Sequence, residues 1–249
     1  MAKKINETIE LMRYMKLPAM ADEYEKELND TKWQNSSFDE RLYYLLNIEN
    51  DSRINHTITK NIKNAKLTIS QADFKDLNKD PDRKLQLELI ESLKDNSYVD
   101  NGLSIIIIGA TGTGKSWLAN AFANKACQEK CKVRYYRLTE LLSDLEAARI
   151  QNRYRQAIIK ISRYDLLIID DFLLTETNTV ERNDILEILE SRVTHKSTIF
   201  ASQFSPEGWH NKLGKGPVAD AILDRITNSS YTIFLQGKSL RETYSKVKQ

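Results

Sequence analysis

The chain has 249 residues, of which 41% are hydrophobic and 29% charged, and its 37 lysine and arginine residues almost balance 35 aspartate and glutamate residues. This composition is typical of a globular protein with a sizeable core, and it excludes a disordered chain. The charge balance excludes a histone-like polycation, and two cysteines are too few for a disulfide framework. No apolar run approaches the roughly 18 residues that a membrane helix needs, so we expect a cytoplasmic protein without membrane contact.

The first part of the chain has the composition of a helical region. All eight glycines lie at residue 102 or later, and glycine is among the residues that disfavour helix interiors most. Ser37 and Glu40 form a capping-box pair ahead of an apolar pattern. Asp80 followed by Pro81 is typical of the start of a further helix, whose apolar pattern continues through Leu85, Leu89, Ile90 and Leu93. We therefore predict a small all-helical N-terminal domain over residues 1–97, which carries partner contacts and is a candidate for DNA contacts.

From residue 98 onward, short apolar runs alternate with helical patterns. Because this alternation is typical of a parallel sheet covered by helices on both faces, we predict an α/β domain over residues 98–249. Its five expected strands are Leu103–Ile108, Val133–Tyr136, Leu166–Ile169, Thr198–Ala201 and Tyr231–Leu235.

The segment after the first expected strand fits the pattern G-x-x-x-x-G-K-S/T and precedes a helical stretch. Glycines allow backbone N–H groups to turn toward phosphate oxygens, and the following helix directs its positive N-terminus at the same anion. In this pattern the lysine reaches the β- and γ-phosphates, and the last hydroxyl ligates Mg²⁺. We expect a site for ATP and Mg²⁺ formed by Gly109, Ala110, Thr111, Gly112, Thr113, Gly114, Lys115 and Ser116.

Two acids follow the expected strand Leu166–Ile169 directly. A parallel strand that ends in acids places carboxylates at the edge of the sheet where ligands of open α/β folds bind. We expect Asp170 in the shell of the Mg²⁺ ion, with Asp171 orienting or deprotonating the attacking water. The alternative interpretation is an ordinary strand followed by a solvated Asp-Asp turn.

Polar residues after the fourth expected strand extend this site. Ser202 and Gln203 could touch the γ-phosphate or the water, and the segment Ala221–Arg225 is expected to be a helix that presents Arg225. An arginine supplied to the γ-phosphate of a neighbouring subunit stabilises the charge of the transition state. The alternative for Arg225 is a surface Asp/Arg pair that contributes little.

Two basic clusters depart from the near-neutral net charge. No acid lies between Ser52 and Ala72, nor between Glu146 and Asp165. On helices these basic residues suit phosphate contacts with weak sequence specificity, whereas the alternative is a solvated face or a contact with a neighbouring subunit. The candidate DNA-binding residues are Arg53, Lys60, Lys63, Arg149, Arg153 and Lys160.

Together these segments resemble the IstB-like ATPases, helper proteins of insertion-sequence transposition that are related to the DnaC helicase loaders within the AAA+ class. The resemblance covers nearly the whole chain, from Leu17–Ala21 to Gly237–Arg241. It implies a P-loop AAA+ core with a mostly parallel five-stranded sheet. The 46 residues after Gln203 are too few for a full C-terminal lid, which weakens a second-sensor role for Arg241.

The resemblance also implies roles for single residues. By matching position, Lys115 and Ser116 bind the nucleotide and Mg²⁺, Asp170 binds Mg²⁺ and Asp171 is the catalytic acid. Gln203 becomes the first sensor and Arg225 a finger that acts in trans. Asp171 departs from the wider AAA+ pattern, in which most members carry Glu, and Gln203 stands where many carry Asn.

The function implied by the resemblance is an ATP-dependent regulator that oligomerises on double-stranded DNA and assists a transposase, with ATP hydrolysis resetting the assembly. Three alternatives use the same phosphate loop. They are a replicative helicase loader of the DnaC type, a small-molecule kinase, and a nucleotide-gated switch with negligible turnover, which the shorter side chain of Asp171 favours.

Overall fold

The computed structural model describes residues 2–28, 30, 33, 36–192 and 196–240. The chain divides into two compact units, Met1–Lys60 and Asn61–Gln249, and each is described by itself. In the described part of the chain, no helix combines the length and the apolar character needed to cross a membrane.

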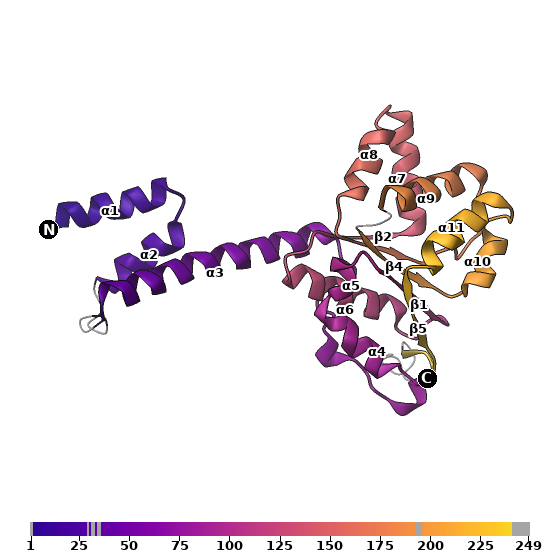
Figure 1. Ribbon diagram of the computed structural model, residues 1–249, viewed down its shortest axis with the longest axis horizontal. Coiled ribbons are helices and arrows are strands. Elements are labelled where there is room, and N and C mark those ends of the chain that lie inside the picture. Colours follow the sequence, from indigo (N-terminus) through magenta and orange to yellow (C-terminus); the bar gives the residue numbers. More distant parts are fainter. Residues whose placement is uncertain (1, 29, 31–32, 34–35, 193–195, 241–249) are drawn as a thin grey trace, which may run out of the picture. The chain divides into compact units, whose positions relative to one another are not determined.

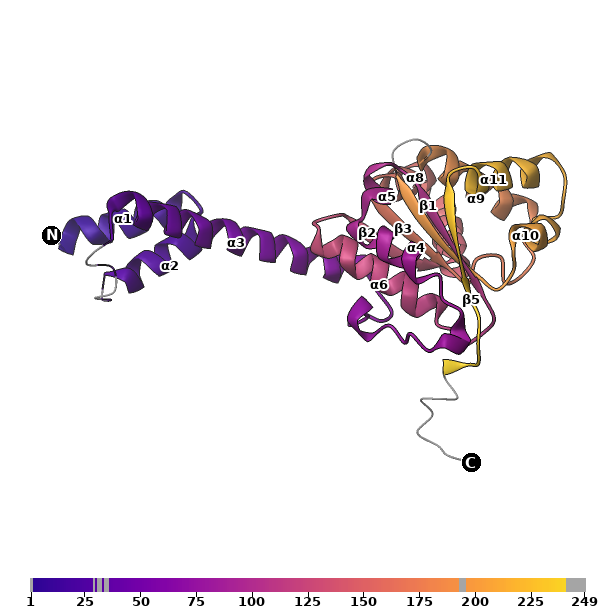
Figure 2. The ribbon, with the colours of Figure 1, turned by 60° about the horizontal axis from the view of Figure 1, so that its bottom comes forward.

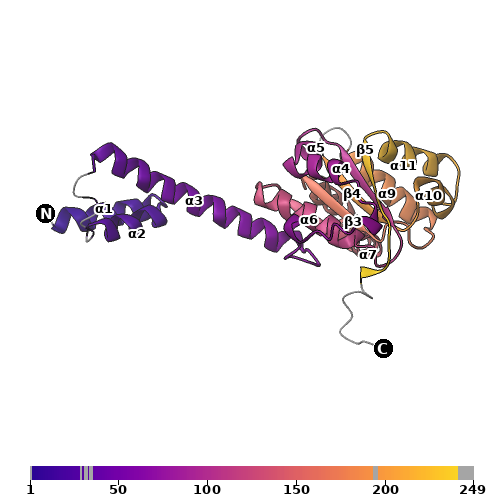
Figure 3. The same ribbon diagram turned by 90° about the horizontal axis from the view of Figure 1, so that it is seen from below.

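The described residues of the first unit form the α-helices α1, α2 and α3, and Figure 3 shows α2 beside the first half of α3. Ser37 and Glu40 form the expected capping box, because the Ser37 N–H donates to Glu40 Oε2 over 2.8 Å and the Glu40 N–H donates to Ser37 Oγ over 3.3 Å. This prediction is confirmed. The helices are α1 (Ala2–Tyr14), α2 (Pro18–Glu27) and α3 (Phe38–Ala65), the last of which continues into the second unit.

Glu49 on α3 has a buried carboxylate that holds the start of α2 and Arg53. Glu49 Oε2 accepts from the Met20 N–H at 3.1 Å, and Oε1 accepts from Arg53 Nε at 2.8 Å. Arg53 Nη2 also donates to the Lys16 carbonyl at the end of α1, over 2.6 Å. Burial disfavours the charged form of Glu49, but the hydrogen bonds from Arg53 and Met20 outweigh it, and the pKa of this carboxyl is lowered.

We expect Glu49→Gln to destabilise the packing of α1 and α2 on α3 by about 1–3 kcal/mol at neutral pH, because it removes a charged hydrogen-bond acceptor. A lowered carboxyl pKa stabilises the folded state above the unfolded value of about 4.3 and loses that contribution as the pH falls through the folded value. Hydrogen exchange of α1 and α2 in the full chain, compared at pH 7 and below pH 4, measures this. The difference between wild type and variant should shrink on acidification.

Glu25→Gln is the matched control, because Glu25 pairs with Arg13 over 3.4 Å and both side chains are more than half exposed. Its effect should stay within about 0.5 kcal/mol at either pH. Equal effects of the two substitutions at pH 7 would contradict the role assigned to Glu49.

The second unit contains a five-stranded sheet in which all neighbouring strands are parallel, in the order β2-β3-β4-β1-β5 (Figure 1). This confirms the predicted α/β fold, and each strand begins and ends within one residue of its expected range. The strands are β1 (Ser104–Gly109), β2 (Val133–Arg137), β3 (Leu166–Asp170), β4 (Ser197–Ser202) and β5 (Ser230–Leu235).

Helices cover both faces of this sheet, with α6 on one side and α9, α10 and α11 on the other (Figure 2). Because side chains alternate along a strand, Ile105 and Ile107 belong to the core beneath α6, whereas Ile106 and Ile108 belong to the core on the opposite face. The helices are α6 (Lys115–Gln128), α7 (Leu138–Ile150), α8 (Tyr154–Ser162), α9 (Thr179–Arg192), α10 (Pro206–Lys212) and α11 (Pro217–Thr227).

The segment before β1 packs on α6, in the same core as the sheet. The rings of Phe74 and Phe122 lie 4.9 Å apart, and those of Tyr98 and Phe122 lie 6.0 Å apart. The compact units therefore divide at residues 60 and 61, whereas the division inferred from composition was placed at residues 97 and 98. This segment contains α4 (Leu87–Ser92), α5 (Ser97–Asp100) and the 3₁₀ helices Phe74–Asp76, Pro81–Arg83 and Leu93–Asp95.

The helix expected to start at Pro81 is much shorter than its pattern suggests. Asp80 does cap it, since its carboxylate accepts from the Asp82 N–H at 3.0 Å, but the element is a 3₁₀ helix that ends at Arg83. Lys84 then adopts a left-handed conformation with φ of 45°, which ends the helical path. The sequence-based prediction was right about the start and wrong about the length.

Candidate nucleotide-binding site

The phosphate loop, residues 109–116, connects β1 to α6 and requires glycine at two positions. Gly112 and Gly114 have φ values of +83° and +94°, in the left-handed region that L side chains rarely adopt. A Cβ atom at Gly112 would also lie 2.1 Å from Ser239 Oγ. The loop therefore keeps this conformation only with glycine at these two positions, of which the motif G-x-x-x-x-G-K-S/T fixes Gly114.

A cavity of about 530 Å³ lies beside the phosphate loop, within the size range typical of small-molecule sites. Its walls come from the loop and the start of α6, from the carboxyl ends of strands, and from the segment before β1. The lining residues are Ile69, Asp76, Leu77, Asn78, Arg83, Thr111, Gly112, Gly114, Lys115, Ser116, Trp117, Leu118, Asp171, Gln203, Leu235 and Leu240.

Positive charge concentrates where α6 begins. Lys115 is the first residue of α6 and only 7% exposed, and its ammonium donates to the Ala110 carbonyl over 2.9 Å. No side chain caps this end of the helix, and its first three residues line the cavity. An anion here gains both the helix N–H donors and the lysine charge, so the geometry suits a phosphate group.

The two acids after β3 lie in different environments. Asp170 is only 2% exposed; its Oδ2 accepts from the Tyr135 hydroxyl at 2.6 Å and its Oδ1 from the Asp171 N–H at 2.9 Å. Burial and the neighbouring Asp170 raise the pKa of Tyr135, so the phenol remains a donor. Asp171 lines the cavity, whereas Asp170 is not among its lining residues.

Asp171 also has an unusual backbone, with φ of 52°. A left-handed conformation costs a residue with a side chain roughly 1–2 kcal/mol, and such strain is often found at functional sites. Arg137 Nε lies 3.8 Å from Asp171 Oδ2, and Asp171 further lines a second cavity of about 280 Å³ next to α7. Its carboxylate is therefore accessible from two sides.

The oxygen donors fit a magnesium ion that is held jointly with a nucleotide. Within the described ranges, no group of three or more His, Cys, Asp and Glu side chains is arranged to hold a metal ion. Mg²⁺ typically binds through one or two protein ligands, several waters and the substrate phosphates. The hydroxyl of Ser116 and the carboxylate of Asp170 suit that kind of site.

Of the polar pair at the end of β4, Gln203 lines the cavity and Ser202, the last residue of the strand, does not. Ser202 is fully buried; its hydroxyl donates to the Phe172 carbonyl over 2.8 Å and accepts from Trp209 Nε1 at 2.9 Å. The expectation that Ser202 could touch phosphate is therefore wrong, because its hydroxyl joins β4 to the Phe172 and Trp209 cluster.

The segment before β1 supplies one whole wall that the sequence interpretation missed. Two buried asparagines of α6 hold this segment: Asn120 Oδ1 accepts from the Ile69 N–H at 3.2 Å, and Asn124 Nδ2 donates to the Ala72 carbonyl over 3.1 Å. The sequence does contain a signal for this wall, because the amide side chains of Asn120 and Asn124 stand one helical turn apart in an otherwise alanine-rich helix. Such residues at a buried face indicate that an irregular segment binds there.

Residues 10–247 match the family described as IstB-like ATP binding protein. The chain belongs to this family. A relative from Sinorhizobium fredii (strain NBRC 101917 / NGR234), named as an insertion-sequence ATP-binding protein, is 35% identical over 234 residues, which are 94% of this chain and 95% of the relative. A Pseudomonas aeruginosa relative, named as an ATP-binding protein of the insertion sequence IS21, is 26% identical over 235 residues, 93% of this chain and 87% of its own.

Solved structures resemble the core of this IstB-like chain. The DnaC helicase loader has a TM-score of 0.53 and 17% identity, with 60% of this chain and 88% of the other covered. AMPPCP-bound DnaA from Aquifex aeolicus has a TM-score of 0.56 and 19% identity, with 72% and 57% covered. At these identities the likeness concerns the fold alone, and it confirms the predicted α/β core with its phosphate loop.

Arg225 of the IstB-like chain lies apart from the cavity at the phosphate loop. Its Nη2 pairs with Glu190 Oε1 over 2.8 Å and its Nη1 donates to the Ala221 carbonyl over 3.0 Å. It lines a separate cavity of about 200 Å³ with Ser104 and Thr198, near the starts of β1 and β4. The phosphate loop follows the end of β1, so Arg225 lies at the amino ends of the strands and the loop lies at their carboxyl ends.

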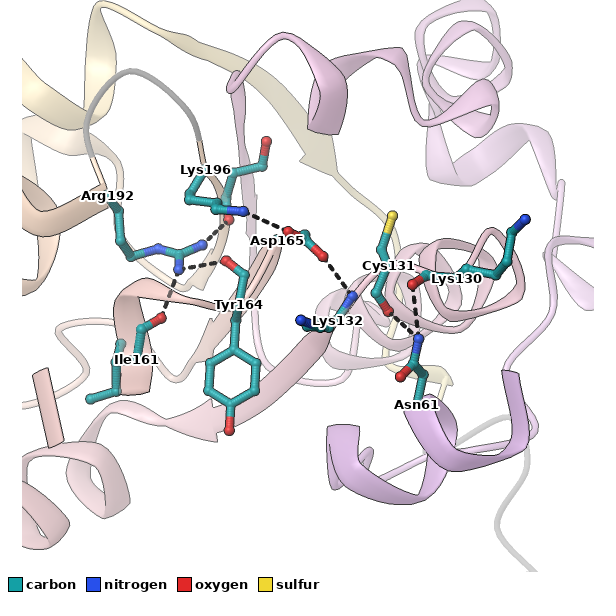
Figure 4. A network of polar contacts seen from close by, with 10 residues as sticks. Asn61, Lys130, Cys131, Lys132, Ile161, Tyr164, Asp165, Arg192 and Lys196 are labelled. Carbon is teal, nitrogen blue, oxygen red and sulfur yellow. Dashed lines mark hydrogen bonds and ion pairs between the residues drawn. The ribbon is translucent and has the colours of Figure 1, made fainter. Parts of the chain in front are cut away.

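A buried arginine lies at the amino ends of β3 and β4 (Figure 4). Arg192 donates to the carbonyls of Ile161 and Tyr164, each over 2.9 Å, and to the Ser197 carbonyl over 2.6 Å. Burial lowers the pKa of its guanidinium to about 10. These bonds connect the end of α9 to the segment before β3 and to the first residue of β4.

The structure separates the candidate DNA-binding residues into two groups. Arg53 is bound to Glu49 and to the Lys16 carbonyl, and Arg149 pairs with the buried Asp184 and lies 4.4 Å above the Tyr154 ring. All six candidates are exposed; the other four are Lys60 and Lys63 on α3, and Arg153 and Lys160 at or on α8, where Arg155 is exposed as well. Arg241, considered for a second sensor, lies outside the described residues.

Proposed function

We propose that this protein is an ATP-dependent DNA-binding regulator that oligomerises on double-stranded DNA and assists a transposase. The observation that carries the proposal is the arrangement of Lys115, Asp171 and Gln203 around one cavity, with Arg225 at the amino ends of the strands. Relatives named for insertion sequences support the link to transposition.

Within one subunit, the side chains around the cavity divide the work of ATP hydrolysis. Lys115 and the N-terminus of α6 neutralise the β- and γ-phosphates, while Ser116 and Asp170 hold Mg²⁺, which supplies further positive charge to the phosphates. Asp171 accepts a proton from the attacking water or orients it, and Gln203 positions the same water. The left-handed backbone at Asp171 fixes the direction of its short carboxylate.

Between subunits, Arg225 completes the site of a neighbour. Its own phosphate loop lies at the carboxyl ends of the strands, so its guanidinium serves a nucleotide only across an interface between copies. Without a neighbouring subunit, the Arg225 guanidinium is neutralised by Glu190, whose Oε1 lies 2.8 Å from Arg225 Nη2. ATP bound between two copies stabilises the oligomer, and hydrolysis loosens it.

The DNA surface that we propose is the exposed face of α8, with the basic side chains Arg153, Arg155 and Lys160. Arg149 and Arg53 are left out because their guanidinium groups are bound within the protein. Contacts of this kind address the DNA backbone and carry little sequence information. Lys60 and Lys63 on α3 form a second candidate surface.

The double substitution Arg155→Gln with Lys160→Gln tests this surface. If both side chains neutralise phosphates, the slope of log affinity against log salt should decrease in magnitude by about 2. Titration of labelled double-stranded DNA at several salt concentrations gives the slope. Lys75→Gln with Lys79→Gln removes the same charge at exposed positions outside α8 and should leave the slope unchanged; equal slopes in all three proteins would exclude α8.

Sedimentation velocity with double-stranded DNA and either ATP or ADP tests the proposed function as a whole. We expect large assemblies with ATP and their dissociation with ADP. A chain that stays monomeric with ATP and DNA would overturn the proposal. The fold likeness to the DnaC loader makes helicase loading the second candidate, and a preference for single-stranded DNA together with binding to a replicative helicase would favour it.

A further inference from the structure

Two hydrogen bonds hold the carbonyl groups of the phosphate loop from outside the loop. The Leu240 N–H donates to the Gly112 carbonyl over 2.9 Å, and Arg83 Nη2 donates to the Thr113 carbonyl over 2.7 Å. Both donors are far from the loop in sequence, so this contact is a property of the tertiary fold.

Arg83 is placed for this contact by its own short element. It ends the 3₁₀ helix Pro81–Arg83, is only 6% exposed, and lines the cavity. Its Nη1 donates to the Asn78 carbonyl over 2.6 Å, so one guanidinium joins two carbonyl groups. A planar fork with fixed donor directions suits this task, whereas an ammonium group is a single point charge.

The Thr113 contact has a consequence for the next residue. The carbonyl of Thr113 and the N–H of Gly114 belong to one planar trans peptide, in which the two groups point in opposite directions. With the carbonyl held toward Arg83, the Gly114 N–H is directed away from Arg83. Gly114 has φ of +94° and, being glycine, would tolerate other orientations of this peptide.

We propose that Arg83 is a positioning residue for phosphate binding, which acts through the peptide between Thr113 and Gly114. By fixing that peptide, Arg83 keeps the Gly114 N–H available to the phosphates of a nucleoside di- or triphosphate. By bonding Asn78, it also joins the wall before β1 to the phosphate loop. The inference rests on the proposed nucleotide site.

The test compares ADP with adenosine, which lacks the phosphates, in calorimetric titrations of wild type, Arg83→Met and Arg83→Lys. For Arg83→Met we expect an affinity for ADP that is lower by roughly ten- to a hundredfold, the size of one lost charged hydrogen bond, and an affinity for adenosine within about twofold of wild type. Arg83→Lys keeps the charge but loses the fork, so its ADP affinity should lie between those of wild type and Arg83→Met.

Arg182→Met is the matched control. Arg182 donates to the Leu213 carbonyl over 3.0 Å and to Thr179 Oγ1 over 2.9 Å, and it does not line the cavity at the phosphate loop. Its ADP affinity should equal that of wild type. Thermal unfolding verifies that each variant is folded, and if Arg83→Met fails to fold, the ratio of ADP to adenosine affinity in Arg83→Lys decides.

Two results would overturn the role of Arg83 and leave the nucleotide site in place. The first is an unchanged ADP affinity in the Arg83 variants. The second is an equal loss of affinity for ADP and adenosine, which would indicate that the segment before β1 has collapsed. A wild-type chain that binds neither compound would overturn the proposed nucleotide site together with the inference. The two failures are therefore distinguishable.

Discussion

Lys115→Met should weaken ATP binding by about thirtyfold or more, because removing one partner of a buried charged contact costs roughly 2–5 kcal/mol. Lys115 is 7% exposed and its ammonium lies 2.9 Å from the Ala110 carbonyl, at the cavity wall. Methionine keeps the length and packing of the side chain but removes its charge. The affinity is measured by calorimetry, or by the fluorescence of Trp117, which lines the same cavity.

Lys125→Met provides the control within the same helix. Lys125 pairs with Glu129 over 2.7 Å, and both side chains are more than a third exposed. We expect its ATP affinity to match wild type. If Lys115→Met binds ATP as well as Lys125→Met does, the cavity beside the loop is not the phosphate site.

The parts of this protein that the sequence predicts are those encoded by neighbouring residues. Each strand is a short apolar run, and the alternating assignment of Ile105 to Ile108 to the two cores follows from the strand period. The phosphate loop is contiguous, and Gly114, which the motif fixes, has a left-handed backbone with φ of +94°. A local pattern suffices because the strand, the loop and the helix start follow one another directly.

The parts that the sequence does not predict depend on partners far along the chain. Arg83 bonds Thr113, and Asn120 holds Ile69, across gaps of 30 and 51 residues. The same holds for charge: Arg149 has no acid after it until Asp165, yet it pairs with Asp184 on α9. A basic run therefore indicates local composition, and only the tertiary structure tells which of its side chains pair with acids elsewhere in the chain.

Arg225→Ala should lower the rate of DNA-stimulated ATP hydrolysis by about three orders of magnitude, the lower end of what an arginine finger contributes. ATP affinity of the isolated chain should stay within about twofold of wild type, because Arg225 lines a different cavity from Lys115. A single-subunit role for Arg225 predicts the same loss of rate. The substitution alone therefore does not distinguish action in cis from action in trans.

Mixing Arg225→Ala with Lys115→Met makes that distinction. The Arg225→Ala variant keeps an intact phosphate loop, and the Lys115→Met variant keeps an intact Arg225. If Arg225 acts on a neighbour, an interface that pairs this loop with this arginine contains a complete active site. With random assembly of equal amounts, about a quarter of the head-to-tail interfaces have this composition. The mixture should then recover up to about a quarter of wild-type activity. If each subunit uses its own arginine, no copy in the mixture carries both groups, and activity stays at the level of the separate variants.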